Sequence, residues 1–456
     1  MNELAKLIQD RYPGNTYQDI ARADGDIPPQ LKLQRNPPQS TADIPFERYT
    51  SPAFFDREME KMWLKVWQFA CRDEHVPEVG DHYVYDIGRK SVLIVRAEDG
   101  LRAYYNSCLH RGTKLKASGT NGWSPSIKCP YHAWEWNLEG TVKNIPCDWE
   151  FPQLDREKAC LPQVKVDSWN GLVFINFDKD AQPLLDYLEV VPDHFANWDL
   201  TSWYAHIHVR KRLPGNWKLA QDAFLEAYHT PVVHPEMTLT VSDHNMQHDI
   251  LSDHVTRDLC AMASPSPTAT RKQTQQELLD TMVMGDRSTV ADRLMVPEGK
   301  TARFVMAEQL RQQMATQYGL DYSDRSVPEV IDSLKYTIFP NLFVVPSVGF
   351  PLILTFRPDG HDHDRSIFDV MIMRPRPTDG SDWQVAEVVE IGENDSYRDV
   401  PGFDPFFGLV LDQDTDIMRW QREGMYASGK GAESLSIYQE ARIRHVHDTL
   451  DKYLAK

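Results

Sequence analysis

The sequence predicts an α+β fold in which a small antiparallel β domain precedes a larger domain, whose antiparallel sheet is flanked by helices. Short β-rich runs parted by turn residues fill 80–106 and return at 169–177. More strands are expected between 336 and 374, whereas helical periodicity marks 219–227 and the tail from 415 to 454. Strands and helices segregated in this way along a chain are typical of the α+β class.

The composition is that of an ordinary globular protein, with 456 residues of which 41% are hydrophobic. This length allows two domains and a large core. The net charge of −18 argues against nonspecific binding to nucleic acids or anionic membranes. No run of about 18 apolar residues is present, and the first residues lack the apolar stretch of a secretory signal. Six cysteines are few for a disulfide scaffold, so we expect a cytoplasmic protein with reduced thiols.

Shifts in pattern along the chain predict its organisation. Residues 1–45 form a polar leader with proline-rich pieces, which we expect to pack on the body of the protein. The small β domain is expected at 46–180 and the larger domain at 181–456. Within the larger domain, 255–330 is interpreted as an insertion that either covers a pocket or is a plain surface excursion.

The stretch LAQDAFLEAYHTPVVHP at 219–235 concentrates polar groups on an otherwise apolar helix. Asp222, Glu226 and His229 stand at i, i+4 and i+7 and are predicted to share one helix face. Pro231 disturbs the helix and allows His234 to turn back towards His229. Two imidazoles beside carboxylates favour a 2-His-1-carboxylate iron site; a surface helix with solvated acids and two incidental histidines is the alternative.

A second set of ligand types lies inside the small β domain. Cys108 and His110 form a CxH pair, and after a gap of eighteen residues Cys129 and His132 form a CxxH pair. Zinc motifs usually separate the members of a pair by two or more residues. Two thiolates and two imidazoles are the ligands of a Rieske [2Fe–2S] centre, which we favour over a zinc site.

Both motifs resemble those of one family, the Rieske non-haem iron (ring-hydroxylating) oxygenases, in the alpha or terminal oxygenase subunit. The similar segments are NSCLHRGTKL, CPYHAWEWNLEG, WNGLVFINFD and EAYHTPVVHP. The resemblance implies a Rieske domain at 46–180 and a catalytic non-haem iron domain at 181–456.

By this resemblance, His229 and His234 bind the catalytic iron, and an aspartate near the C-terminal helix is the third ligand. Three candidates stand in LDQDTD, namely Asp412, Asp414 and Asp416. Similarity to the family favours Asp414, and an N-cap role for this aspartate is the alternative.

The family also implies a path for electrons between subunits of a head-to-tail trimer. Glu226 occupies the position of the carboxylate that bridges a Rieske histidine, here His132, to the iron ligand His229 of the next subunit. Asp222 is then expected to orient this site through hydrogen bonds. Arene dioxygenases usually have aspartate at the bridging position, whereas glutamate is more similar to the oxygenases of carnitine and choline.

The function implied by the resemblance is that of a terminal oxygenase with a [2Fe–2S] cluster and Fe(II). NADH would supply electrons through a separate flavin reductase, with or without a ferredoxin, since the chain has no GxGxxG fingerprint. A homotrimer is expected, with or without a small beta subunit. The expected substrate is an aromatic or bulky hydrophobic compound that is mono- or dihydroxylated, as in aromatic hydrocarbon catabolism; a quaternary ammonium compound is the alternative. A pure electron carrier and a structural zinc protein are the competing classes.

Overall fold

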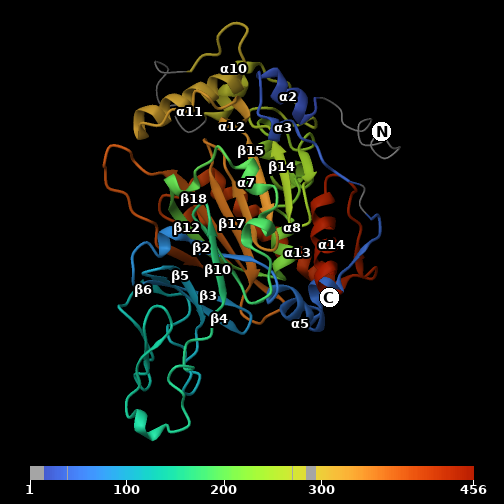
Figure 1. Ribbon diagram of the computed structural model, residues 1–456. Coiled ribbons are helices and arrows are strands. Elements are labelled where there is room, and N and C mark those ends of the chain that lie inside the picture. The colour runs from blue at the N-terminus through green and yellow to red at the C-terminus, as the bar shows by residue number, and fades with distance from the viewer. Residues whose placement is uncertain (1–14, 38–39, 270, 284–293) are drawn as a thin grey trace. The chain divides into compact units, whose positions relative to one another are not determined.

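The computed structural model describes residues 15–37, 40–269, 271–283 and 294–456, which form two compact units (Figure 1). The larger unit comprises residues up to 51, 190–356 and 364–449. The smaller unit comprises 52–189, 357–363 and 450–456. It begins at 52, not at 46 as the sequence pattern suggested, because Tyr49 is buried in an apolar cluster with Leu219 and Met425 of the larger unit.

The smaller unit is built mainly from short strands. They form a four-stranded sheet in the order β5-β4-β3-β6, a three-stranded sheet β10-β11-β2 and a three-stranded sheet β7-β8-β9. Its elements are α5 (Pro52–Glu58), a π-helical turn (Met59–Trp63), β2 (Gln68–Arg72), β3 (Asp81–Ile87), β4 (Lys90–Ala97), β5 (Gly100–Tyr105), β6 (Asn121–Trp123), β7 (Ile127–Lys128), β8 (Glu135–Trp136), β9 (Val142–Asn144), β10 (Lys165–Trp169), β11 (Leu172–Asn176) and α6 (Leu184–Leu188). One core cluster packs both predicted ligand cysteines together with Trp134 and Trp136.

The larger unit is organised on an eight-stranded sheet in the order β13-β14-β15-β16-β17-β18-β12-β19. Long β12 pairs antiparallel with β18, and β19 adds to it in parallel. The strands are β12 (Trp203–Pro214), β13 (Gln247–Ile250), β14 (Val255–Cys260), β15 (Ser333–Ile338), β16 (Leu342–Val345), β17 (Leu352–Pro358), β18 (Arg365–Pro375) and β19 (Val388–Ile391). A separate two-stranded pair joins β1 (Ile44–Pro45) to β20 (Ala432–Glu433). The predicted α+β class is thereby confirmed.

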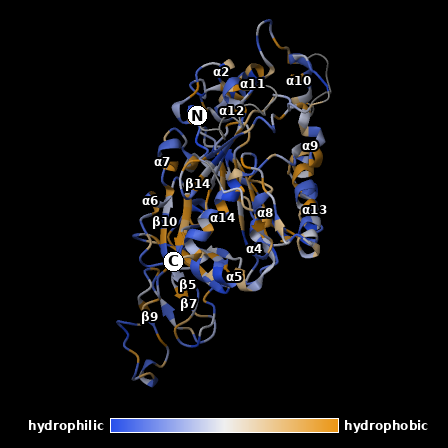
Figure 2. Ribbon diagram, turned by 90° about the vertical axis from the view of Figure 1, so that its right-hand side faces the viewer, coloured by the Kyte–Doolittle hydropathy of each residue, from blue (hydrophilic) through white to orange (hydrophobic). Residues whose placement is uncertain are grey.

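Helices accompany this sheet. They are α2 (Tyr17–Ala23), α3 (Pro29–Lys32), α4 (Glu47–Thr50), α7 (Val191–His194), α8 (Trp217–Asp222), α9 (Thr230–Val233), α10 (Gln275–Met282), α11 (Ala302–Tyr318), α12 (Val327–Ile331), α13 (Pro405–Ala427) and α14 (Ala441–Leu454). Figure 1 shows α10, α11 and α12 gathered with α2 and α3 at one end of the sheet. Figure 2 shows α9 beside α13. No helix in the described ranges has both the length and the apolar character that crossing a bilayer requires.

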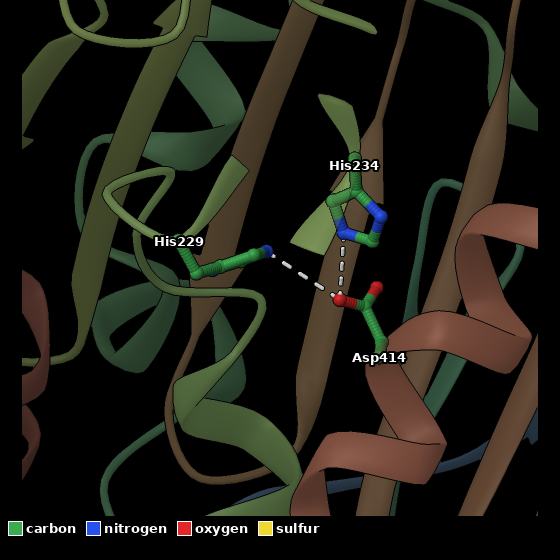
Figure 3. A group of neighbouring side chains, drawn as sticks. All are labelled: His229, His234 and Asp414. Atoms are coloured by element: carbon green, nitrogen blue, oxygen red, sulfur yellow. Dashed lines mark hydrogen bonds and ion pairs between the residues drawn. The ribbon is translucent and has the colours of Figure 1, made fainter. Parts of the chain in front are cut away.

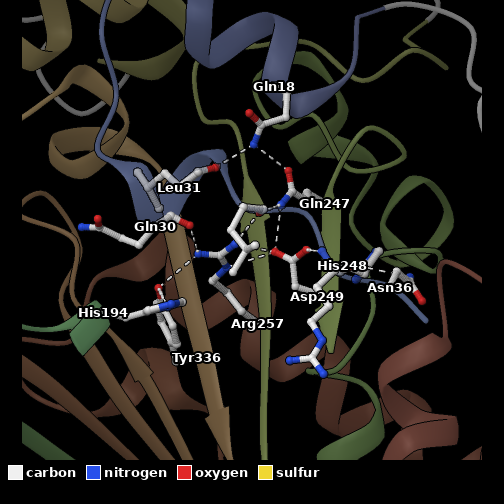
Figure 4. Close-up of polar contacts among 12 residues, drawn as sticks. Gln18, Gln30, Leu31, Asn36, His194, Gln247, His248, Asp249, Arg257 and Tyr336 are labelled. Atoms are coloured by element: carbon white, nitrogen blue, oxygen red, sulfur yellow. Dashed lines mark hydrogen bonds and ion pairs between the residues drawn. The ribbon is translucent and has the colours of Figure 1, made fainter. Parts of the chain in front are cut away.

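Part of the predicted leader lies against the edge of the sheet (Figure 4). Arg257 of β14 donates to the carbonyl oxygens of Gln30 and Leu33 at 2.7 and 3.0 Å. Its guanidinium also binds the Asp249 carboxylate at 2.6 Å. Since Arg257 is fully buried, these leader carbonyls satisfy donors that would otherwise be buried unpaired.

Two predicted segments differ in detail from the structure. The stretch 255–330 begins with β14, an internal strand of the sheet, so its first six residues are part of the core rather than of an insertion. Residues 284–293 of the same stretch lie outside the described residues. The predicted C-terminal helix is two helices, because the chain between α13 and α14 turns through Gly431, whose φ of +71° suits glycine, into β20.

Candidate metal centres

The two histidines of the larger unit flank one short helix. His229 is the N-cap of α9, and His234 follows its last residue. The predicted continuous helix is wrong: α8 ends at Asp222, so Asp222, Glu226 and His229 do not share a helix face. The chain re-enters a helix at Thr230–Pro231, where proline is favoured because the first-turn amides have no partner in the helix.

His229, His234 and Asp414 point toward one another (Figure 3). The Asp414 Oδ1 oxygen lies 2.9 Å from His234 Nε2 and 3.4 Å from His229 Nε2. One ligand atom from each of the three residues lies within 4.8 Å of the others. Two imidazole nitrogens and one carboxylate oxygen converging in this way fit the ligand set of non-haem Fe(II) and leave other coordination positions open.

The other ring nitrogen of each histidine, Nδ1, contacts a side-chain oxygen. Nδ1 of His229 contacts the Glu226 carboxylate, which also accepts from the His229 backbone amide at 3.1 Å. Nδ1 of His234 lies 2.7 Å from Oε1 of Gln413. An acceptor at Nδ1 keeps the proton on that nitrogen and leaves the Nε2 lone pair for a metal. Gln413 was not identified from the sequence, although it directly precedes Asp414.

The charges at this centre favour an ionised carboxylate. Burial would raise the pKa of Asp414, but the hydrogen bonds and charges of His229 and His234 outweigh burial and lower it. Burial would likewise lower the pKa of His229, but Asp414 and Glu226 raise it to about 10. The three side chains therefore attract positive charge to the point between them.

The neighbouring aspartates of α13 have other environments. Asp412 accepts from the Tyr397 amide at 3.0 Å and from the Ser396 hydroxyl, and Asp416 is exposed. The N-cap of α13 is Asp404, which removes the alternative that Asp414 caps this helix.

Asp222 belongs to a second buried cluster. Its Oδ2 accepts from the Tyr49 hydroxyl at 2.8 Å, and the same hydroxyl lies 2.8 Å from Glu433 Oε1 and 2.8 Å from His447 Nε2. These partners stand 173 to 398 positions from Tyr49, and no sequence pattern marks Tyr49, Glu433 or His447 as neighbours of Asp222. The hydrogen bond of Asp222 joins it to this cluster rather than to His229.

In the smaller unit, Cys108 and Cys129 each begin a loop of the same design. The Cys108 amide donates to Thr113 O at 2.8 Å, and the Cys129 amide to Trp134 O at 2.8 Å. The fourth residue after each cysteine has a left-handed backbone, with φ of +75° at Gly112 and +58° at Ala133. Two matched loops thus present two pairs of potential ligands.

The side chains of these loops gather into a sulfur- and nitrogen-rich pocket. Cys108 and Cys129 are 4% and 2% exposed, and the His110 and His132 ring centroids are 4.6 Å apart. Burial raises the pKa of the Cys108 thiol, and the adjacent Cys129 thiol adds to this. His110 Nδ1 is buried and, among the described residues, has no hydrogen-bond partner. An orphaned imidazole nitrogen beside two buried thiols fits a metal cluster.

Comparison with known proteins identifies the two domains that contain these groups of residues. Residues 66–155 match the Rieske [2Fe-2S] domain, and residues 199–456 match the catalytic domain of the ring-hydroxylating alpha subunits. The chain belongs to this family of Rieske non-haem iron oxygenases. The resemblance inferred from the motifs is confirmed, and the Rieske domain replaces the zinc alternative.

Individual relatives differ in what they oxidise. The carnitine monooxygenase oxygenase subunit of Escherichia coli (strain K12) is 32% identical over 207 residues, covering 43% of this chain and 54% of the relative. The salicylate 5-hydroxylase large oxygenase component of a Ralstonia species is 28% identical over 213 residues, covering 43% and 50%. The chain thus spans about half the length of the curated relatives it matches.

Solved structures share the fold over nearly the whole chain. A quaternary ammonium Rieske monooxygenase in complex with L-carnitine has a TM-score of 0.62 at 19% identity, covering 90% of this chain and 95% of that one. Naphthalene 1,2-dioxygenase from a Rhodococcus species bound to indole has a TM-score of 0.59 at 20% identity, covering 91% and 95%. These likenesses establish the fold alone.

Proposed function

We propose that the chain is the terminal oxygenase component of a multicomponent system that hydroxylates an aromatic or other bulky hydrophobic substrate with O2. The observation that carries the proposal is the convergence of His229, His234 and Asp414 in a chain that also has a Rieske domain. Bound Fe(II) would supply dioxygen activation, and a [2Fe–2S] cluster on Cys108, His110, Cys129 and His132 would supply single electrons.

The protein's part in this chemistry is to hold and orient the ligands. Glu226 and Gln413 keep the two Nδ1 protons in place, so that His229 and His234 present Nε2 to the iron. Asp414, ionised because its pKa is lowered, offsets part of the metal charge. Asp222 acts on this segment through α8, which it anchors to Tyr49.

We further propose that electrons enter from the partner subunit's His132 through Glu226, in a head-to-tail homotrimer with or without a small beta subunit. Glu226 contacts His229 directly. Tyr228 and Val232, which lie before and after His229 in the chain, are 58% and 85% exposed. Exposed apolar side chains beside a charged centre favour burial by another chain. NADH would reach the Rieske centre through a flavin reductase, with or without a ferredoxin.

A second candidate is hydroxylation next to nitrogen in a quaternary ammonium compound, followed by release of an amine. Glu226 at the bridging position and the 32% identity to a carnitine monooxygenase subunit favour it.

A single turnover of chemically reduced, metal-loaded protein tests the proposal. The protein would meet labelled dioxygen and a mixed panel of arenes and trimethylammonium compounds, with products identified by mass spectrometry. Two labelled oxygens in an arene product indicate dihydroxylation, one indicates monohydroxylation, and a released amine supports the second candidate. No labelled product from any compound, although both metals are present, would contradict the oxygenase assignment for these substrate classes.

A further inference from the structure

A buried cation stands in the middle of the large sheet. Lys335 of β15 is paired across the strands with Asp258 of β14, and its Nζ lies 3.3 Å from Asp258 Oδ2. Both strands are internal, because β13 and β16 flank them. The neighbours Leu334 and Tyr336 are each 2% exposed, whereas the Lys335 side chain retains 14% exposure. Part of the Lys335 side chain therefore remains within reach of water-sized space.

The Asp258 carboxylate already binds a second cation, the guanidinium of Arg442. The Arg442 guanidinium of α14, fully buried, binds Asp258 Oδ2 and donates to Thr256 Oγ1 at 3.1 Å. Two cations thus share one carboxylate, which leaves one positive charge in excess. Burial lowers the pKa of Lys335 to about 8 and that of Arg442 to about 9, as expected where positive charge is poorly compensated.

Contacts with the residues on both sides of Glu226 place this pair beside the segment that carries His229 and His234. Arg442 donates at 3.3 Å to the carbonyl oxygen of Leu225, the residue before Glu226. Ala227, the residue after Glu226, packs in an apolar cluster with Cys260. Cys260 lies two positions beyond Asp258 on β14 and so faces the same side of the sheet. The charges of Asp414 and Glu226 act on Lys335 as well.

The charge balance at this face predicts what the space accommodates. Fe(II) on the three ligands would be balanced by Asp414 and Glu226. Lys335 and Arg442 against Asp258 still leave one unit of positive charge, and an uncompensated buried charge is costly. A carboxylate group of a ligand placed next to Lys335 offsets this charge locally through a charge-assisted hydrogen bond.

We propose that Lys335 anchors a carboxylate group of the substrate, so that the substrate of this chain is an organic carboxylate held with its anionic end at β15. The inference rests on the proposed function, because it places the substrate beside the His229, His234 and Asp414 centre. It narrows the proposed hydrophobic substrate to one that carries a carboxylate, either on an aromatic framework or as part of a betaine. Lys335 is a binding residue that no local sequence pattern marks.

Binding to metal-loaded, full-length protein tests the inference without turnover. Calorimetric titration would use salicylate, biphenyl-4-carboxylate and L-carnitine, each compared with a partner that lacks the carboxylate, namely salicylamide, biphenyl-4-carboxamide and choline. Lys335→Met should weaken binding of the preferred carboxylate at least about tenfold, since losing one partner of a buried charge pair costs more than 1.4 kcal/mol. Binding of the partner without a carboxylate should change by no more than about twofold.

Two further variants separate recognition from folding. Lys335→Arg keeps the charge and should retain most of the carboxylate affinity. Lys32→Met removes an exposed lysine paired with Asp26 and should have no effect. In the unmodified protein, carboxylate affinity should fall as the pH rises through about 8, because the ammonium form is the one that binds. Lys335→Arg should abolish this fall. If Lys335→Met does not fold, the pH profiles of carboxylate affinity for the unmodified protein and for Lys335→Arg test the inference in its place.

Several results would overturn the inference. One is that Lys335→Met binds carboxylates as well as the unmodified protein does, and another is that it loses equal affinity for compounds with and without a carboxylate. A carboxylate affinity that does not change above pH 8 is the third such result. Binding of the compounds without a carboxylate in preference to every carboxylate would overturn it too. Preference for salicylate, for biphenyl-4-carboxylate or for L-carnitine would each support it and identify the framework. Labelled oxygen in an uncharged arene alone would refute the inference and keep the proposed function. Selective carboxylate binding without any oxidation would support the inference and contradict the proposed function.

Discussion

Replacing Glu433 by glutamine should make the protein more stable at alkaline pH and leave it unchanged at acidic pH. The Tyr49 hydroxyl has one proton and three partners at 2.8 Å, namely Asp222, Glu433 and His447. It can donate to only one of them, so the other two must donate to it. Burial lowers the pKa of His447, so this ring is neutral and donates from Nε2. One of the two carboxyl groups must therefore carry a proton.

The pKa values indicate how much stability depends on that proton. Burial raises the pKa of Glu433 to about 7, against an ordinary 4.5, and burial also raises the pKa of Asp222. The folded state therefore favours the protonated acid. This contribution is fully present below about pH 4.5 and is lost as the pH rises through about 7. A rise of this size corresponds to a loss of about 3 kcal/mol by pH 8.5.

Glutamine imitates the protonated acid, because its amide can donate to the Tyr49 oxygen at any pH. We expect Glu433→Gln to match the unmodified protein in urea unfolding at pH 5 and to exceed it by about 3 kcal/mol at pH 8.5. Glu390→Gln, which alters an exposed partner of Arg212, is the matched control and should show no pH-dependent gain. If the variant is less stable than the unmodified protein at pH 8.5, or differs from it equally at both pH values, the conclusion that one of the two carboxyl groups carries a proton is refuted.

The remaining predictions concern the metal centres. His229→Ala should lose the mononuclear iron in metal analysis and preserve the visible Rieske spectrum; loss of both metals, or of neither, would contradict the assignment. Asp414→Ala should weaken iron binding at least about tenfold, since it removes a ligand, whereas Asp412→Ala should not. If Asp412→Ala weakens iron binding and Asp414→Ala does not, the third ligand is Asp412. Glu226→Gln should retain both metals and lower coupled turnover by more than about tenfold, and unchanged product yield per electron would remove the bridging role.

Ligands that are close in the chain could be predicted because their spacing is itself the chemical signal. Cys108 and His110, or His229 and His234, lie within one loop or one helical turn and its flanks, so residue type and separation are enough to indicate a shared metal. The class of the fold followed from the segregation of short strands and longer helical stretches along the chain. The break between Asp222 and His229 was missed, since apolar periodicity continues through it and only Pro231 hints at a new start.

Selection among the three aspartates near the C terminus needed the helix itself. At about 100° of rotation per residue, Asp412 and Asp416 share one face of α13, whereas Asp414, between them, points to the opposite face. Only Asp414 is turned to His234, a residue 180 positions earlier. Similarity to the family favoured the same residue, but the buried position of its side chain is a property of how α13 packs.

The sequence alone determined the family, the two metal motifs and the order of the domains, because each depends on residues that are neighbours in the chain. The tertiary structure decided which single residues complete the sites. Gln413 behind His234, the Tyr49 cluster around Asp222, and Lys335 beside Asp258 belong to no local pattern. Such residues are brought together by strand pairing and helix packing across hundreds of positions, and their pKa values depend on burial that exists only in the folded chain.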